Sequence, residues 1–472
     1  MISDITAENY EEKRRELLEV NSNLNSLVLR ESEKKLDSYL SSLKNEYRES
    51  CGRKIRYDIP VLTDPALRAS RLYRFCSRLP KGADLHVHDM ALLPACELIP
   101  LLADTPEFCI NADRASYDLK YVPCDSPVPD GYIRFAEALD SGLYSEDELI
   151  VNWTVCGAGD EDIWDYFEKL FTRHSALSES CDFAEKYYDR AFRYYCGNNV
   201  MHIEIHMMLT DSMEESEEYV RAVRNSYYRV KKEFPFLTVR IIGAGVKADN
   251  AKKELSKKCF LNASYVQEMI KDESVPGRAP NLIIGFDLVN EEDRSLPLHD
   301  FAPMLLGIRK QYPDMKLYIH GGESLDAENE NLIDAYLLGV SRVGHGLNLY
   351  RYPDLHSKFI ESEICLEVCP ISNQTLQYTT DIRNHPATEY LRTGLPIALC
   401  SDDPSYMENE TLTDDFFAAV VGWNLSLGVL KQLGIHSIMY SGLDHEEKAA
   451  SMRAYNLMWK SFVERELREL GI

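Results

Sequence analysis

The sequence predicts an α/β protein whose main domain is a (β/α)8 TIM barrel, with an N-terminal helical extension and an insertion after the first strand. From residue 83 onward, eight short β-rich runs alternate with stretches of helical periodicity. The runs are nearly continuously apolar, which is typical of parallel strands that helices cover on both faces. An open doubly wound sheet is disfavoured, because no glycine-rich turn follows the first run.

The predicted strands and helices follow one another in the order that a barrel requires. We expect strands at 83–88, 199–206, 237–245, 281–288, 316–320, 342–347, 364–370 and 396–401. The intervening helices include 218–234, 298–312, 331–338 and 387–393.

Two segments lie outside this alternation. Residues 1–75 carry charges throughout, with leucines at helical spacing, and are predicted to form a helical extension that packs on the barrel or on a second subunit. The barrel domain is assigned to residues 76–472. An insertion at about 100–162 is too long and too proline-rich for a simple connection between a strand and a helix.

The composition excludes several classes of partner. The 472 residues contain 52 Lys+Arg and 77 Asp+Glu, a formal net charge of −25, which argues against nucleic acid as a partner. No run is long and apolar enough for a membrane span, and no secretory leader is evident at the start. We therefore expect a cytoplasmic protein with reduced cysteines, secretion being the alternative.

Metal-competent residues occur where the predicted strands end, which is where a barrel places its active site. His86 and His88 are two residues apart on the first strand and so face the same side. His320 ends the fifth strand and Asp402 follows the eighth. An HxH pair alone is more often structural, but three imidazoles and one carboxylate together form a ligand set suited to Zn²⁺, with room for a water.

Three further polar residues accompany this set. Glu323 follows His320 after two glycines, which let the backbone approach a ligand. His345 stands between glycines at the end of the sixth strand, and Asp403 is adjacent to Asp402. Two neighbouring carboxylates in a closed pocket are not both expected to stay unpaired.

Several segments in this order resemble the motifs of the adenosine deaminase superfamily, and in particular of the adenosine deaminase-related growth factors, the type-two adenosine deaminases. They are PKGADLHVHDMA, IIGFDLVNEED, HGGES, RVGHGLNL, LEVCPISNQTL, DIRNHP and SDDPSYM. The resemblance runs from about residue 79 to the C-terminus. It implies that the insertion corresponds to a receptor-binding domain and the N-terminal helices to a dimerisation arm, and hence a homodimer.

By this resemblance, one Zn²⁺ per chain would be bound by His86, His88, His320 and Asp402. Glu323 would donate a proton to purine N1, His345 would orient the hydrolytic water, and Asp403 would contact water and base. Chemistry agrees with these roles, because zinc lowers the pKa of bound water to about 7 and a carboxyl group in a dry pocket stays protonated.

Three residues are candidates for substrate binding. Asp89 matches the family's HD pair and is predicted either to bind a ribose hydroxyl or to cap a helix. Trp164 resembles a substrate-lining tryptophan, the alternative being a core aromatic. Asn290 stands where the family has a glycine whose amide faces purine N3, and His206, where the family has an arginine, is predicted to be structural.

The resemblance implies hydrolytic deamination of adenosine, and of 2′-deoxyadenosine, to inosine and ammonia. The small-molecule partner is then a purine nucleoside. Three alternatives stay open: a nucleotide deaminase, a metal-dependent aminohydrolase of another purine or modified nucleoside, and a non-catalytic signalling protein on the same scaffold.

Overall fold

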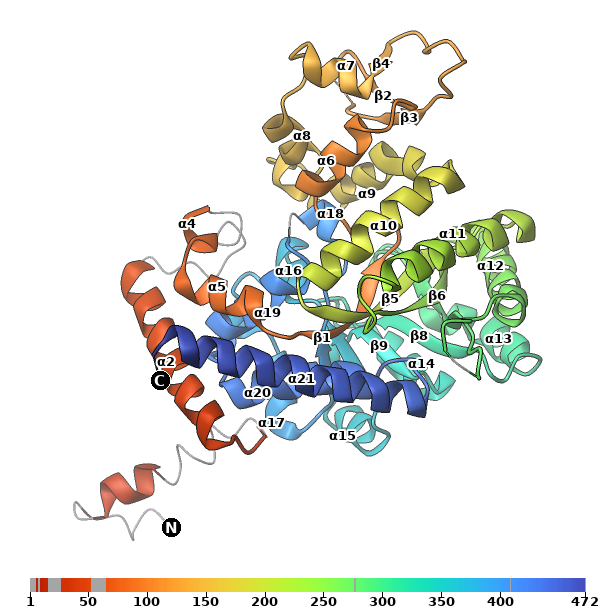
Figure 1. Cartoon of the computed structure of the whole chain (residues 1–472). Coiled ribbons are helices and arrows are strands. Elements are labelled where there is room, and N and C mark those ends of the chain that lie inside the picture. Colours follow the sequence, from red (N-terminus) through yellow and green to blue (C-terminus); the bar gives the residue numbers. More distant parts are fainter. Residues whose placement is uncertain are drawn as a thin grey trace.

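Eight parallel strands form a single sheet in the computed structural model, which describes residues 6, 9–15, 27–51, 65–114, 116–275, 277–407 and 409–471. Neighbouring strands pair in the order β1-β5-β6-β7-β8-β9-β10-β11 (Figure 1). Their bounds are Gly82–His88, Val200–Met208, Thr238–Val246, Ile283–Val289, Lys316–Gly321, Arg342–His345, Cys365–Val368 and Ile397–Leu399. All eight predicted strands are therefore present.

The sheet closes into a barrel where its first and last strands meet. Val87 of β1 forms a parallel bridge with Asp402, just beyond β11. The Asp402 amide donates to the His86 carbonyl at 3.0 Å, and the His88 amide donates to the Asp402 carbonyl at 2.9 Å. Helix α20 (Leu427–Met439) contacts both β1 and β11 from outside. The predicted (β/α)8 barrel is confirmed.

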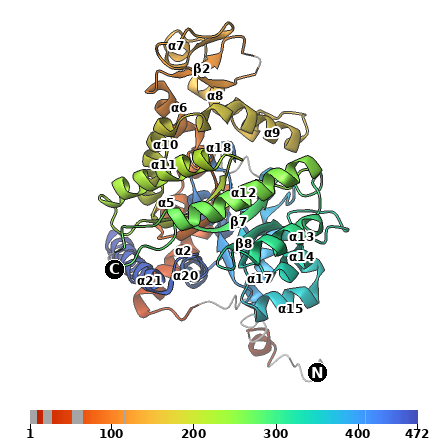
Figure 2. The same ribbon diagram turned by 90° about the vertical axis from the view of Figure 1, so that its right-hand side faces the viewer.

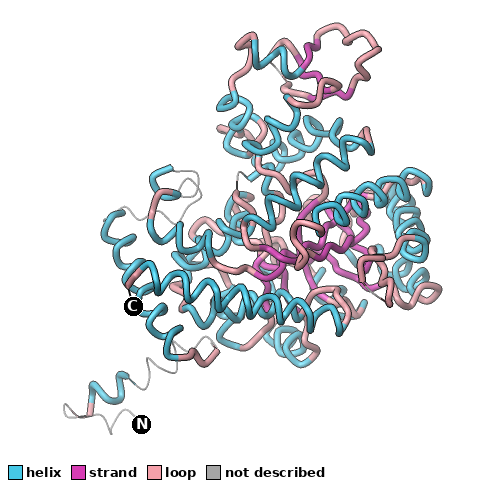
Figure 3. The backbone as a smooth tube through the Cα atoms, in the orientation of Figure 1, coloured by secondary structure: helices cyan, strands magenta, loops and turns pink. Residues whose placement is uncertain are grey.

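Helices surround the strands, as Figures 2 and 3 show. The four predicted helices correspond to α11, α13, α14 and α17. The helices that follow the strands, together with α10 before β5, are α10 (Cys181–Gly197), α11 (Met213–Lys231), α12 (Asn250–Met269), α13 (Leu298–Arg309), α14 (Asn331–Leu338), α15 (Pro353–Glu361) and α17 (Ala387–Thr393).

The connection between β1 and α10 contains a small unit of its own, at the top of Figure 1. Its three antiparallel strands pair in the order β3-β2-β4, a sheet that the sequence did not predict. Trp153 is fully buried in this unit and stacks on Phe135. The elements are α6 (Ala95–Ala103), β2 (Phe108–Asn111), β3 (Leu119–Tyr121), β4 (Tyr132–Arg134), α7 (Phe135–Asp140), α8 (Glu146–Asn152), η3 (Val155–Gly157), α9 (Ile163–His174) and η4 (Ser175–Ser178).

The N-terminal region packs on the barrel through α2 (Glu31–Cys51), which contacts α5 (Arg71–Arg78), α20 and α21 (His445–Glu469). Its buried face consists of Leu36, Leu40, Leu43 and Tyr47. Residues 16–26 and 52–64 of the predicted extension lie outside the described residues. Among the described helices, not one is both long and apolar enough to cross a bilayer.

Candidate metal centre and active site

The predicted metal-binding side chains lie together at the carboxyl end of the barrel. One ligand atom from each of His86, His320, His345 and Asp402 lies within 4.8 Å of all the others, and these four residues are buried. His88 belongs to the same cluster, because its Nε2 atom is 3.2 Å from His320 Nε2 and 3.2 Å from Asp402 Oδ1. The structure thus brings together all four residues of the predicted ligand set.

Two residues of the cluster depart from the extended backbone conformation of a strand. His345 and Asp402 adopt φ values of 65° and 61°, in the left-handed region that costs a non-glycine residue on the order of 1–3 kcal/mol. β9 and β11 accordingly end at His345 and Leu399, earlier than predicted. Strain of this kind is typical of functional sites, where the surrounding fold enforces it.

Two carboxylates beneath the cluster orient the imidazole rings. His86 Nδ1 lies 2.7 Å from Glu367 Oε2, and His320 Nδ1 lies 2.6 Å from Asp287 Oδ2. Because carboxylates only accept hydrogen bonds, both rings carry a proton on Nδ1 and direct Nε2 into the cluster. His86 Nε2 is buried without a hydrogen-bond partner, as a metal ligand would be.

A second layer of charge supports these carboxylates. Arg342 donates to both Glu367 and Glu204, and all three side chains are buried. Burial alone would raise the pKa of Glu204, but the Arg342 and His202 side chains lower it to about 2. Burial would likewise raise the pKa of Glu367, but Arg342 and His86 lower it, so the carboxylate beneath His86 stays ionised.

His206, predicted to be structural, lies directly beneath the cluster. Its Nδ1 is 2.7 Å from Asp287 Oδ2, and its ring centroid is 4.3 Å from that of His86. Sequence reasoning assigned no role to Asp287 or Glu367. Their roles could have been inferred from their position, since each is a carboxylate inside an otherwise apolar strand. Carboxylates are rarely buried without a partner.

Glu323 lies beside the cluster and is buried. Burial, with the negative charges of Asp402 and Glu292, raises its pKa well above the ordinary value and so favours the protonated carboxyl. Burial also lowers the pKa of His345 and so favours the neutral imidazole. His345 Nδ1 is 3.2 Å from Glu323 Oε1. The site thus combines a carboxyl group of raised pKa with an imidazole of lowered pKa.

Asp403 lies on the His88 side of the same cluster. Burial and the neighbouring Asp402 carboxylate raise the pKa of Asp403 to about 8, against the opposing effect of His88. Its Oδ1 atom is buried and has no hydrogen-bond partner. Asp403 therefore offers a hydrogen-bonding group that the protein itself does not satisfy.

The three candidate substrate-binding residues lie in loops and in the insertion. Asp89 accepts a hydrogen bond from the Tyr188 hydroxyl. It caps no helix, because α6 begins at Ala95 with Pro94 as its N-cap, so the capping alternative is wrong. Asn290 has a φ of 126°, the conformation that favours the glycine it replaces, and its amide donates to Ser295 Oγ.

Trp164 lies near the N-terminus of α9, half-buried. Its ring centroid is 6.1 Å from that of Tyr378. The pKa of Tyr378 is raised by burial and by the charge of Glu323, and further by Asp293 and other acidic neighbours, which locates this tyrosine near the site. Trp164 thus contacts Tyr378 and also packs edge-on against the buried Phe167, with 5.5 Å between ring centroids. Its role in substrate binding stays a prediction, with the core aromatic as the alternative.

Acidic residues lie near Glu323 and Tyr378. Glu291 is buried and pairs with Arg294 at 3.3 Å, and burial raises its pKa to about 7. Asp293 accepts a hydrogen bond from the Ser324 hydroxyl, and Glu292 pairs with Lys247 at 3.3 Å. These carboxylates follow β7 directly, on the loop that also carries Asn290.

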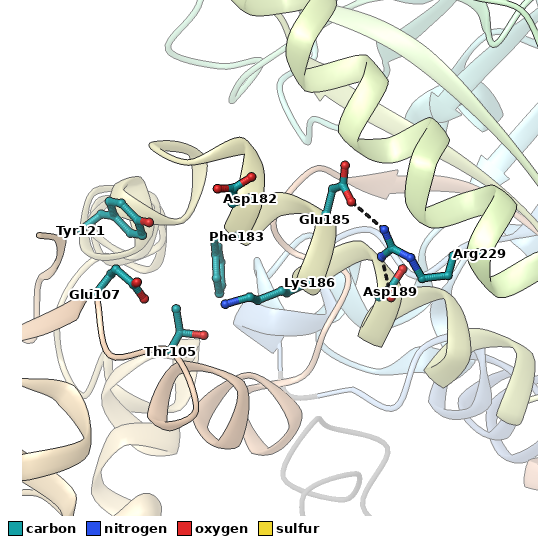
Figure 4. Close-up of a pocket in the computed structure, with 9 residues that line it drawn as sticks. All are labelled: Thr105, Glu107, Tyr121, Asp182, Phe183, Glu185, Lys186, Asp189 and Arg229. Carbon is teal, nitrogen blue, oxygen red and sulfur yellow. Dashed lines mark hydrogen bonds and ion pairs between the residues drawn. The ribbon is translucent and has the colours of Figure 1, made fainter. Parts of the chain in front are cut away.

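A separate cavity lies between the insertion and the barrel helices (Figure 4). Its volume is about 390 Å³. Arg229 bridges Glu185 and Asp189 on one wall. The cavity is lined by Thr105, Glu107, Tyr121, Asp182, Phe183, Glu185, Lys186, Asp189 and Arg229, none of which belongs to the metal cluster.

Comparison with solved structures bears on the fold. An N6-mAMP deaminase from Arabidopsis is 16% identical with a TM-score of 0.59, and the match covers 81% of this chain and 99% of that one. An amidohydrolase from Burkholderia ambifaria, solved with bound zinc, is 18% identical with a TM-score of 0.57, covering 84% and 94%. Both are similar to this chain in fold.

Comparison with known sequences identifies the family. A protein named adenosine deaminase 2 from Dictyostelium discoideum is 28% identical over 428 residues, covering 84% of this chain and 75% of the relative. Adenosine deaminase 2 from Homo sapiens is 27% identical, covering 84% and 81%. Residues 147–454 match the family described as adenosine deaminase. The chain, with its buried histidine and aspartate cluster, therefore belongs to the adenosine deaminase family of hydrolases.

Proposed function

We propose that this protein is a zinc-dependent aminohydrolase that converts adenosine, and 2′-deoxyadenosine, to inosine and ammonia. The observation that carries the proposal is the buried Glu323 carboxyl, whose pKa is raised, beside a cluster of imidazoles and a carboxylate. A purine ring nitrogen must be protonated as C6 is attacked, and a carboxyl group of raised pKa supplies that proton. Relatives named adenosine deaminase support the choice of substrate.

The donor set fits one zinc ion per chain. His86, His88 and His320 offer Nε2 atoms and Asp402 offers Oδ1, which are three nitrogens and one oxygen of the kind zinc prefers. When bound, zinc supplies Lewis acidity that lowers the pKa of water at the site to about 7, so hydroxide is available at neutral pH.

The chain's own residues perform the remaining chemistry. The free Nε2 of neutral His345 accepts a hydrogen bond from the attacking water, and Asp403 holds the water from the other side. As the C6–O bond forms, electron density moves to N1 and Glu323 transfers its proton there. His345 takes a proton from the water as it attacks and passes it to the amino nitrogen, so the C6–N bond breaks and ammonia leaves. The proton of the new C6 hydroxyl returns to Glu323, which restores the acid and yields the C6 carbonyl of inosine.

The acidic residues near Glu323 suit an uncharged nucleoside better than a negatively charged nucleotide. Glu291 and Asp293 would face a phosphate with carboxylates, whereas phosphate sites use helix N-termini or Arg and Lys side chains. Ammonia release should therefore be measured with adenosine, 2′-deoxyadenosine, AMP and N6-methyl-AMP in parallel. Faster turnover of either monophosphate would reject the nucleoside assignment.

Substitution at Glu323 tests the mechanism. Glu323→Gln removes the acidic proton and keeps the side-chain shape, so kcat should fall by about 10²- to 10⁴-fold while one zinc per chain is retained. Glu328→Gln, an exposed change in the same loop, is the matched control and should keep full activity. Full activity in Glu323→Gln would reject Glu323 as the proton donor. A zinc-loaded wild type that deaminates no purine would favour the non-catalytic alternative.

A further inference from the structure

A chain of buried hydrogen bonds leads from the backbone to Glu323. The Ala387 amide donates to His385 Nδ1 at 3.1 Å. His385 Nε2 lies 3.1 Å from Asn373 Oδ1, and Asn373 Nδ2 donates to Glu323 Oε1 at 3.0 Å. Asn373 lies on α16 (Pro370–Thr375), and His385 follows the short helix η6 (Ile382–Asn384). Both side chains are buried.

The direction of each hydrogen bond in this chain is fixed. A backbone N–H can only donate, so His385 Nδ1 must accept from Ala387. Burial lowers the pKa of His385 to about 3, so the ring is neutral and its single proton is on Nε2. His385 therefore donates to Asn373 Oδ1, which turns the amide nitrogen of Asn373 toward Glu323.

The same reasoning fixes the Glu323 carboxyl. The amide nitrogen of Asn373 can only donate, so Glu323 Oε1 accepts. His345 Nδ1 is 3.2 Å from that oxygen and 3.2 Å from Asn373 Nδ2. With its proton on Nδ1, the neutral His345 ring donates to Oε1; with its proton on Nε2, Nδ1 accepts the second N–H of Asn373. In either tautomer Oε1 accepts from the Asn373 amide, which favours Oε1 as the carbonyl oxygen of the acid and Oε2 as the oxygen that carries the proton.

We infer that Asn373 and His385 are positioning residues, which hold the Glu323 carboxyl through Oε1 so that Oε2 carries the proton. The inference rests on the proposed function, in which that proton is transferred to the purine. The proposed mechanism uses the His345 tautomer with its proton on Nδ1, which leaves Nε2 as an acceptor for water. One backbone amide thus fixes the orientation of the acid.

Two substitutions of His385 separate this role from a structural one. Gln at this position places an amide nitrogen near the Nε2 site and keeps a donor to Asn373, whereas Asn is too short to reach it. We expect kcat of His385→Asn to fall by about 10- to 100-fold, with KM within about twofold of wild type and zinc content unchanged. His385→Gln should recover most of that loss, and Asn373→Leu should resemble His385→Asn.

An infrared measurement tests the same inference without activity. The band that is lost on Glu323→Gln substitution identifies the protonated carboxyl. Its C=O stretch should move to higher frequency in His385→Asn, where Oε1 loses an oriented donor, and stay near the wild-type value in His385→Gln. A folded, zinc-bound His385→Asn variant with wild-type kcat, or an unmoved band, would overturn the inference. Should the wild type deaminate no purine nucleoside, the proposed function fails and the infrared result alone decides this one.

Discussion

Asp402 is joined to His86 through both backbone and side chain. Its amide donates to the His86 carbonyl at 3.0 Å, and its Oδ1 lies 3.5 Å from His86 Nε2. The first contact closes the barrel between β1 and β11, and the second belongs to the proposed zinc site. Barrel closure and metal binding therefore depend on the same two residues.

Metal removal should weaken the fold. A ligand that binds only the folded state stabilises it by about 4 kcal/mol when its free concentration is 1,000 times Kd. We expect a chelator to lower the unfolding temperature by several degrees and added zinc to restore it, measured by differential scanning calorimetry. Asp402→Asn should remove most of this zinc dependence. An unfolding temperature that does not respond to zinc would contradict the proposed site.

The carboxylate beneath His86 should control zinc affinity. Glu367→Gln leaves Arg342 facing the amide oxygen, so the amide nitrogen meets the His86 Nδ1 proton and the ring must change tautomer. We expect zinc affinity to fall by about 10- to 100-fold in a chelator competition titration.

Glu447→Gln is the matched control for that substitution, because Glu447 pairs with Arg240 in a buried ion pair away from the site. It should lower the free energy of unfolding without changing zinc affinity. Equal loss of affinity in the two variants would show that Glu367 acts only through stability.

Arg294 should hold Trp164 at the site. Its guanidinium is 3.0 Å from Asp162 and 2.5 Å from Asp165, the residues that flank Trp164 in the sequence. Exposed ion pairs contribute about 0.2–1 kcal/mol each. We therefore expect Arg294→Ala to raise the KM for adenosine by about two- to tenfold, with little change in kcat, as Trp164→Ala should also do.

Arg278→Ala is the control for this ion pair, since Arg278 is equally exposed and pairs with Asp444 at the other end of the barrel. It should leave KM unchanged. A similar rise of KM in both variants would mean that Arg294 has no specific role at the site.

Lys81 should make stability depend on pH. The side chain is buried against the carbonyls of Ser77, Leu79 and Asn198, and burial lowers its pKa to about 7. Between pH 7 and about 10.4 the unfolded chain binds a proton that the folded chain lacks, so this group's contribution to stability rises with pH, by at most about 1.4 kcal/mol per unit.

Urea unfolding of wild type and Lys81→Met at pH 7, 8 and 9 measures this contribution. The difference in unfolding free energy should shift in favour of wild type as the pH rises, because methionine has no proton to gain. A difference that is constant over this range would show that the Lys81 pKa is not lowered.

The barrel could be predicted because each strand and helix can be recognised from the local spacing of its apolar residues. In addition, strands 83–88 and 316–320 end in histidines, which are recognisable as metal ligands. The closure of the sheet followed from the number of strands. The sheet of the insertion was not predicted, since β3 and β4 are only three residues long and carry too short a pattern.

The residues that support the site were harder to predict. Asp287 and Glu367 lie on different strands from the histidines they orient, and His385 is linked to Glu323 through Asn373, twelve positions earlier in the chain. Such contacts depend on the register between strands and on side-chain direction, which one sequence does not reveal. Glu323 and Asp403 could be predicted because they adjoin recognisable ligands.

The seam between β1 and β11 also has a consequence for biosynthesis. The ribosome releases His86 early, but Asp402 emerges only after the seven further barrel strands have been made. A chain that is still being synthesised therefore cannot assemble the complete set of ligands, and premature capture of the ion at high affinity is avoided. Metal acquisition would then mark the moment at which the newly made polypeptide has finished folding.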